Sequence, residues 1–288
     1  MEEAKIVYLP REVNEIGNNT YYIDNSDTGA NHMVESNFGF DIDQLVVNND
    51  YRVNKDYLLP TTFAKNVAIA VDIAKRFEVE DKTIITALEN VSLPPSRFTL
   101  LAGINNSTIF DSSYNSDPDS LLGLITTLKM TINRQAGTQN QRPYYIYHNL
   151  VLGEMRELGD AQGFAKVKHN MILDKLIELS GEYEGLIDNI CLLGSQWLNS
   201  DQTPADKSED NHNLILYKGV IFKVFLKAGD INRYLEDKIR PHSWIWIKGS
   251  QNTIFSEIVT EHFLADKFDL AKVARQDQSW RQMRKDYE

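Results

Sequence analysis

The segment 111-DSSYNSDPDSLLGLI-125 decides how this chain is organised. A strand expected at about 98–110 leads directly into the polar residues of this segment. After Pro118, the pair Asp119–Ser120 is of the type that caps helices, and Asp119 or Ser120 is expected to start a helix. A strand that opens into a polar loop and a helix is typical of the carboxyl edge of an open α/β sheet, where ligands bind. A well-capped surface turn has the same composition, so the rest of the sequence must distinguish the two.

Strands and helices alternate from this segment onward. Buried strands are expected at 143–153, 186–194 and 243–250, and further helices at 162–180 and from about residue 252. The apolar stripes of the two longer helices consist of Leu121, Leu122, Ile125, Leu128 and Ile132, and of Phe164, Val167, Met171, Ile172, Leu176 and Leu179. This alternation predicts an α/β fold with a Rossmann-like, mostly parallel sheet and helices on both faces.

The first part of the chain has a different pattern. Three β-rich stretches, 5–9, 19–23 and 40–47, are separated by Asn, Asp and Gly. Apolar residues at helical spacing then predict helices at 61–77 and 81–90.

The two patterns meet at 92-SLPPSR-97, where two prolines stop any helix and stiffen the connection. We therefore predict two domains, 1–93 and 97–288. Residues 200–212 form a polar loop, and the polar tail 274–288 is expected to be loosely held.

Composition excludes several classes of function. The 288 residues carry a net charge of −11, which argues against a broad nucleic-acid surface. Cys191 is the only cysteine, so neither an intrachain disulfide nor a thiolate zinc site is expected. The N-terminal sequence lacks the apolar core of a signal peptide, and no stretch approaches a membrane span in length. We expect a cytoplasmic protein without a metal site of its own.

The common catalytic motifs are absent. The sequence contains no GxxxxGK[ST] phosphate loop, no GxGxxG after a strand, no HExxH and no GxSxG. The candidate ligand loops are therefore the three expected strand ends, at 111–120, 152–160 and 248–253. In the third, Lys248 and the following helix N-terminus could together hold an anion.

The order of these loops resembles the carboxyl-terminal part of the Mur ligases, ATP-dependent amide ligases that extend the peptide of peptidoglycan precursors. The motifs that carry the resemblance are PSRF, DSSYNSDPDS, LGEMRELG, a histidine and KGSQ, in that order. The match extends from about residue 60 to 265 and is similar in particular to the branch that adds D-alanyl-D-alanine to a UDP-N-acetylmuramoyl-tripeptide. It implies that residues 1–93 end the family's central ATPase domain and that 97–288 are its carboxyl-terminal domain.

The resemblance implies roles for nine residues. The family's nucleotide contacts fall on Asn66, Arg97, Asp111, Tyr114 and Asn115, and its substrate side on His169, Lys248, Gly249 and Ser250. It implies ATP and Mg²⁺ as cofactors, but it carries over no metal ligand and no catalytic residue.

Several of these residues have a structural role as the alternative. Asn66 can cap a helix and Arg97 can pair with a surface carboxylate. Asp111 can end its strand by accepting from backbone N–H groups, and His169 can serve only in packing.

The sequence departs from the family's motifs at several positions. Ser112 stands where the family has a second aspartate, and Ser96 stands where it has the glycine of Pro-Gly-Arg. Gln251 replaces the arginine of Lys-Gly-Ser-Arg and so removes a positive charge, while Thr62 and Phe63 replace a His-Asn pair. The loss of an acidic side chain at Ser112 would remove a ribose or metal contact.

The implied function is part of an ATP-dependent amide-bond ligase. Such an enzyme adds an amino acid or dipeptide to a UDP-N-acetylmuramoyl-peptide through an acyl phosphate. Phosphoryl transfer needs Mg²⁺ and a phosphate cradle, and the family's P-loop lies before the matched part. We therefore expect this chain to be the half that closes over the nucleotide, working with an upstream P-loop-containing chain.

The alternative function is a non-catalytic nucleotide- or peptide-binding module with the same fold. Ser112 and Gln251 favour this module, whereas Asn66, Arg97 and the LGEMRELG turn favour the ligase. The related folate-polyglutamate ligases are a third possibility, which the Tyr-Asn and Glu-Leu-Gly motifs disfavour.

Overall fold

The computed structural model describes residues 12–15, 20–24, 32–35, 44–47, 51–54, 64–90, 94–137, 147–156, 158, 163–199, 203–204, 212–250 and 254–287. The chain divides into two compact units, one of residues 1–92 with 130–138 and one of residues 93–129 with 139–288. Among the helices of these described stretches, none has the length and apolar character needed to cross a membrane.

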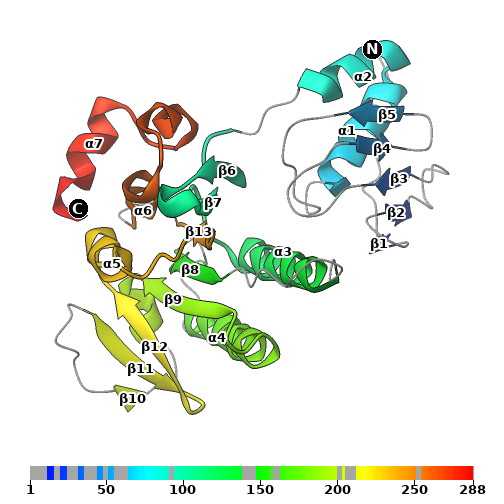
Figure 1. Cartoon of the computed structure of the whole chain (residues 1–288). Helices are drawn as coiled ribbons and strands as arrows, with labels where there is room; N and C mark the ends of the chain where they lie inside the picture. The colour runs from blue at the N-terminus through cyan, green and yellow to red at the C-terminus, as the bar shows by residue number, and fades with distance from the viewer. Residues whose placement is uncertain are drawn as a thin grey trace. The chain divides into compact units, whose positions relative to one another are not determined.

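The first unit combines an antiparallel sheet with two helices (Figure 1). Its strands lie in sequence order: β1 (Glu12–Glu15), β2 (Thr20–Asp24), β3 (His32–Glu35), β4 (Gln44–Val47) and β5 (Tyr51–Asn54). Helix α1 (Ala64–Arg76) lies inside its predicted range, and α2 (Asp81–Asn90) has the predicted bounds. The predicted strand at 5–9 lies outside the described residues.

The second unit is built around one mixed sheet (Figure 1). Across the described residues its strands lie in the order β10 (Thr203–Pro204), β11 (Asn213–Tyr217), β12 (Val220–Phe225), β9 (Ile187–Leu193), β8 (His148–Gly153), β13 (Trp244–Lys248), β7 (Thr108–Ser112) and β6 (Thr99–Ala102). Neighbours from β12 to β7 are parallel, and the strands beyond them pair antiparallel. The predicted α/β fold with a mostly parallel sheet is confirmed.

Helices cover both faces of this sheet (Figure 1). Helices α3 (Pro118–Gly137) and α4 (Phe164–Glu182) lie on one face, and α5 (Ala228–Leu235) and α6 (Glu257–Phe263) lie on the other. Because both faces are covered, the central strands are buried nearly throughout, and their sequences HNLVLG and WIWIK contain the uninterrupted apolar runs LVL and WIWI.

The prediction of a single strand at about 98–110 was wrong in one respect, because this part of the chain forms two antiparallel strands, β6 and β7. A tight turn at Ile104–Asn106 joins them, and Asn105 and Asn106 have φ angles of 55° and 54°. Asparagine tolerates this left-handed conformation better than most residues do. The pair Asn105–Asn106 was therefore an available sequence signal for a turn.

The elements of the second unit that were not predicted from the sequence include β11, β12 and α5. The hairpin β11–β12 turns at Lys218–Gly219, where both residues have positive φ, at 47° and 83°. Two consecutive positive φ angles make the primed type of turn that matches the twist of a hairpin.

The apolar stripe predicted for α4 was partly wrong. The buried residues are His169, Ile172, Leu173, Leu176 and Leu179, whereas Phe164 and Val167 are exposed. At 100° per residue, Phe164 and Val167 lie roughly a quarter turn or more from that buried face. The sequence therefore carries two apolar stripes, and the sheet covers one of them.

The C-terminal tail, expected to be loosely held, is packed. Its helix α7 (Gln278–Arg284) is capped by Asp277, whose Oδ1 accepts from the backbone N–H groups of Ser279 and Trp280. The side chains of Trp280 and Tyr287 pack against the core on the α5–α6 face. Apolar side chains in the middle and near the C-terminal end of the polar tail therefore hold it in place.

Candidate functional site

The strand order brings the three candidate loops to one edge of the sheet. Strand β13 lies between β7 and β8, and its last residue, Lys248, is opposite Ser112 on one side and Leu152 on the other. The loop after β7 leads to α3 on one face, and the loop after β13 leads to α6 on the other. Such a reversal is the place where open α/β sheets bind ligands.

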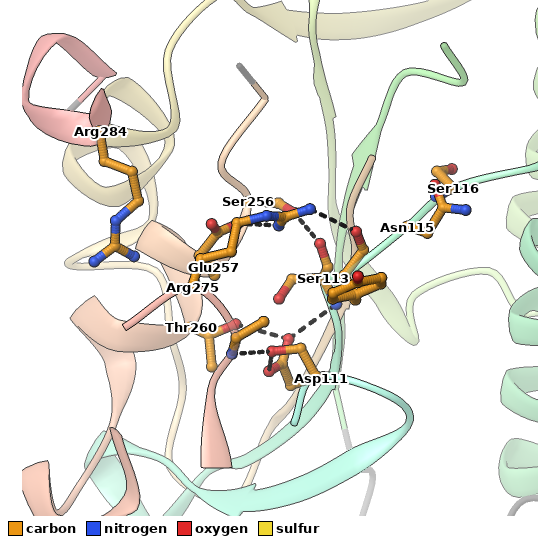
Figure 2. A network of polar contacts seen from close by, with 12 residues as sticks. Asp111, Ser113, Asn115, Ser116, Ser256, Glu257, Thr260, Arg275 and Arg284 are labelled. Atoms are coloured by element: carbon orange, nitrogen blue, oxygen red, sulfur yellow. Dashed lines mark hydrogen bonds and ion pairs between the residues drawn. The ribbon is translucent and has the colours of Figure 1, made fainter. Parts of the chain in front are cut away.

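The loop after β7 is held by donors from other parts of the unit (Figure 2). The carbonyl oxygen of Ser113 accepts from Ser256 Oγ at 3.4 Å, and that of Tyr114 accepts from Arg275 Nη2 at 2.8 Å. The carbonyl oxygen of Asn115 accepts from Lys248 Nζ. Because three successive carbonyl groups are bonded, the loop is pre-organised.

The loop then starts helix α3 one residue earlier than predicted. The helix begins at Pro118, and Asp117 rather than Asp119 caps it, because Asp117 Oδ1 accepts from the backbone N–H of Ser120 at 2.9 Å. Ser120 Oγ donates back to Asp117 Oδ2 at 2.6 Å. Proline is favoured at the first helical position, where its missing N–H group costs nothing.

Asp111 lies beneath the loop with its side chain fully buried. Its Oδ1 accepts from Ser113 N at 3.0 Å and Thr260 Oγ1 at 3.1 Å, and its Oδ2 accepts from Ser96 Oγ at 2.7 Å. Burial raises the pKa of Asp111, and these hydrogen bonds oppose the rise. The geometry favours the structural role considered for Asp111, and its nucleotide contact stays a prediction.

Ser96 has a structural role that a glycine could not fill. Its Oγ donates to Asp111 and accepts from the backbone N–H of Ala274 at 2.8 Å, so one hydroxyl ties the turn at 94–97 to two other segments. Its φ angle is 55°, a conformation that costs a serine more than a glycine. The two hydrogen bonds to buried partners offset that cost.

Three of the predicted site residues remain accessible. Arg97 is exposed, and Tyr114 and Asn115 are half-buried. The guanidinium carbon of Arg97 lies 4.2 Å from the centroid of the Tyr114 ring. A planar cation stacked on an aromatic ring at this edge presents both an anion-binding group and an aromatic surface.

The residues of the third loop are buried rather than open to an anion. Burial lowers the pKa of Lys248 to about 8, while the carboxylates of Asp117 and Asp111 oppose that change. A Cβ atom on Gly249 would lie 2.0 Å from both the Ser113 carbonyl oxygen and Ser256 Oγ, so the close approach of the two loops requires glycine. Ser250 is buried, and residues 251–253 lie outside the described residues.

Hydrogen bonds from buried side chains hold the turn after β8 in place. Glu154 is fully buried, and its carboxylate accepts from Arg156 Nε at 2.5 Å and from the backbone N–H of Gln196 at 2.6 Å. His169 Nε2 accepts from the backbone N–H of Met155 at 3.1 Å, so its proton lies on Nδ1, which donates to the Ala165 carbonyl at 2.7 Å.

Burial lowers the pKa of His169, which favours the neutral ring that these two bonds require. Both ring nitrogens of His169 are thus used within the protein. The geometry favours the packing role considered for this residue, and its substrate contact stays a prediction.

Asn66 belongs to α1 of the first unit. The position of its side chain lies outside what the structure describes, so its contact with adenine also stays a prediction. Within the described residues, no group of three His, Cys, Asp or Glu side chains could hold a metal ion, and we assign no Mg²⁺ ligand to them.

Sequence reasoning missed two charged residues of this region, Glu257 and Arg275. Glu257 is fully buried, and its Oε2 lies 3.2 Å from Arg275 Nη1. Burial raises the pKa of Glu257 to about 7, although the charge of Arg275 opposes the rise. No motif marked either residue, because their partners are distant in sequence.

No family model matches the chain. Its fold is similar to that of solved Mur ligase structures. The UDP-N-acetylmuramoylalanyl-D-glutamyl-2,6-diaminopimelate–D-alanyl-D-alanyl ligase from Acinetobacter baumannii is 16% identical and has a TM-score of 0.50, covering 88% of this chain and 43% of its own. A MurF structure from the same organism is 16% identical with a TM-score of 0.51, covering 88% of this chain and 44% of its own.

A third structure, the MurF ligase from Thermotoga maritima in complex with ADP, is 15% identical with a TM-score of 0.50, and the match covers 88% of this chain and 45% of that one. At this identity the likeness shows a shared fold. The chain spans less than half the length of each of these three structures.

Proposed function

We propose that this chain is part of an ATP-dependent amide-bond ligase that adds an amino acid or dipeptide to a UDP-N-acetylmuramoyl-peptide. The order of the motifs along the sequence and the fold shared with Mur ligase structures support this function. In the proposal, residues 1–93 end a central ATPase domain and 97–288 form the carboxyl-terminal domain. The P-loop and the Mg²⁺ ligands come from outside this sequence, and the protein works in the cytoplasm.

The observation that carries the proposal is the stack of Arg97 on Tyr114 at the edge where the three loops meet. The Arg97 guanidinium can donate to phosphate oxygens, and the half-buried Tyr114 ring on which it stacks lies at the same edge. Lys248 supports this surface from below by holding the Asn115 carbonyl. In the ligase, ATP would supply the phosphoryl group that activates the substrate carboxylate.

In this reading, the pre-organised loop after β7 has a defined task. It holds Tyr114 and Asn115 at the protein surface before any ligand arrives, so little conformational entropy is lost on binding. Closure of such a surface over a nucleotide would position the reacting groups and exclude water.

Calorimetric titration of the chain with Mg·ADP and Mg·ATP tests the proposal. We expect binding that Arg97→Ala weakens by at least about tenfold, because a hydrogen bond to a charged group contributes roughly 1.5–3 kcal/mol. The matched control is Arg240→Ala. Arg240 makes a similar stack, 3.9 Å from the Tyr147 ring, next to the amino end of β8.

Arg240→Ala should leave nucleotide affinity unchanged. Two results would count against the proposal: no binding of either nucleotide at millimolar concentration, or equal affinity of the Arg97→Ala variant and the original chain.

A second candidate function, the non-catalytic binding module, is favoured by the environment of Asp111. Its carboxylate is fully buried and accepts from Ser96 and Thr260 side chains, so it offers no free oxygen to a ribose or a metal ion. Titration with two ligands distinguishes the candidates. A ligase domain should bind nucleotide more tightly when the UDP-N-acetylmuramoyl-peptide is present, since the sites are linked, whereas a module should show no coupling.

A further inference from the structure

We propose that Arg275, in the C-terminal segment, is a positioning residue of the candidate nucleotide site. It sets the position of Tyr114 and, through the Tyr114 ring, that of Arg97. That the ligand of this site is a nucleotide rests on the proposed function, whereas the contacts of Arg275 with Tyr114 and Glu257 do not depend on it.

Arg275 joins three separate segments with one side chain (Figure 2). Its Nη2 donates to the Tyr114 carbonyl oxygen at 2.8 Å, and its Nη1 lies 3.2 Å from Glu257 Oε2. Its guanidinium carbon also lies 5.2 Å from the centroid of the Tyr114 ring and 5.4 Å from that of Trp280. A forked guanidinium can donate in two directions and stack at once, which a lysine ammonium cannot reproduce.

The contact with Tyr114 bears directly on the accessible part of the site. The Tyr114 ring lies near two guanidinium groups, with Arg97 at 4.2 Å and Arg275 at 5.2 Å from its centroid. Arg275 in addition holds the backbone of Tyr114, whose N–H donates to the Ser96 carbonyl at 3.3 Å. Loss of Arg275 would free both the carbonyl group and the ring of the residue on which Arg97 stacks.

Glu257 fixes the direction of Arg275. The Glu257 side chain is fully buried and only 6% of the Arg275 side chain is exposed, so each charge compensates the other where water is largely excluded. The backbone at Arg275 has a φ of 59°, a conformation that is unfavourable for a residue other than glycine. The surroundings must hold this turn in place.

The packing of the C-terminal tail holds the turn at Arg275 in place. The Phe255 ring lies 6.3 Å from the Trp280 ring and 4.9 Å from the Tyr287 ring. Arg284 pairs with Glu261 of α6 and is almost fully buried. The tail is thus attached to the same segment, around α6, that follows the third loop, so Arg275 connects the first and third loops.

The test compares Arg275→Lys and Arg275→Gln with the control Arg281→Gln, which changes an exposed arginine of the same tail. Three quantities are measured: the midpoint of thermal unfolding, hydrogen exchange of the amides at 112–117, and the affinity for Mg·ADP. Arg275→Lys keeps a positive charge beside Glu257, so we expect its unfolding midpoint to stay close to that of the original chain. Its amides at 112–117 should exchange about tenfold faster, and its ADP affinity should fall about tenfold. Arg281→Gln should change none of the three.

A purely structural role predicts a different pattern. In that case Arg275→Lys would match the original chain in exchange and affinity, while Arg275→Gln would only lower the unfolding midpoint, and the proposal would be overturned. If the original chain binds no ADP, the proposed function fails, and exchange alone decides. Faster exchange confined to 112–117 supports the positioning role, and unchanged exchange rules it out.

Discussion

Ser96 and Asp111 show how one hydroxyl group can hold a buried carboxylate in place. The resemblance places a glycine at position 96 and a nucleotide contact at Asp111. In the structure, the Ser96 hydroxyl donates to Asp111 and accepts from Ala274 N. The Ser96 hydroxyl therefore holds the Asp111 carboxylate inside the protein, and the nucleotide contact of Asp111 stays a prediction.

His148 makes the stability of the second unit depend on pH. Burial lowers its pKa to about 4, from an ordinary value of 6.5. Its Nδ1 accepts from Trp246 Nε1 at 3.0 Å, a bond that requires the neutral ring. Because the unfolded chain binds the proton more readily, stability is fully present above about pH 6.5 and is lost as the pH falls toward 4.

We expect this loss to amount to roughly 3 kcal/mol for a shift of this size. His148→Phe keeps an aromatic ring beside Trp244 and Trp246, whose ring centroids lie 6.3 and 6.1 Å from that of His148. The variant cannot titrate and should flatten the decrease in stability between pH 6.5 and 4, although it leaves Trp246 Nε1 without this acceptor. Urea unfolding at several pH values measures how steeply the free energy of unfolding changes with pH in the original chain and in the variant. Equal slopes for the two proteins would show that His148 does not titrate as argued.

At the scale of elements, Gly249 controls the approach of the loops after β7 and β13. Since a Cβ atom there would lie 2.0 Å from the Ser113 carbonyl oxygen, we expect Gly249→Ala to move the loops apart. The variant should lose about 1–3 kcal/mol of stability and weaken nucleotide binding. Urea unfolding and calorimetry measure the two effects.

Gly181 provides the matched control for Gly249. It lies in α4, and an added Cβ would meet no atom within 4 Å. Gly181→Ala should therefore be neutral or stabilise the protein by up to about 1 kcal/mol, because alanine favours a helix over glycine. If Gly249→Ala behaves in the same way, the two loops do not pack as the structure describes.

At the scale of the whole molecule, all four tryptophans report on the second unit, since Trp197, Trp244, Trp246 and Trp280 belong to it. Leu150 is fully buried at the centre of its sheet. Leu150→Ala should cost about 2–5 kcal/mol and lower the tryptophan-monitored unfolding midpoint by roughly 10 °C.

Val167→Ala, on the exposed side of α4, is the control and should shift the midpoint by only about 1–2 °C. A small shift for Leu150→Ala would mean that the parallel sheet is not the main source of stability in this unit.

The sequence by itself determined the α/β class, the bounds of α2 and the three strand ends that carry polar loops. These features depend on local periodicity and on turn residues such as the prolines at 94 and 95, which act within a few positions of themselves. The charged pair of Glu257 and Arg275 and the burial of Asp111 left no local signal, because their partners come from distant segments.

Only the tertiary structure decided that β13 lies between β7 and β8, and with that, which loops form one site. It also decided which candidate residues face outward: Arg97 and Tyr114 do, whereas Asp111 and His169 are turned inward. Strand order and burial are set by pairing and packing between segments far apart in the chain. Local residue patterns specify each segment but not its neighbours.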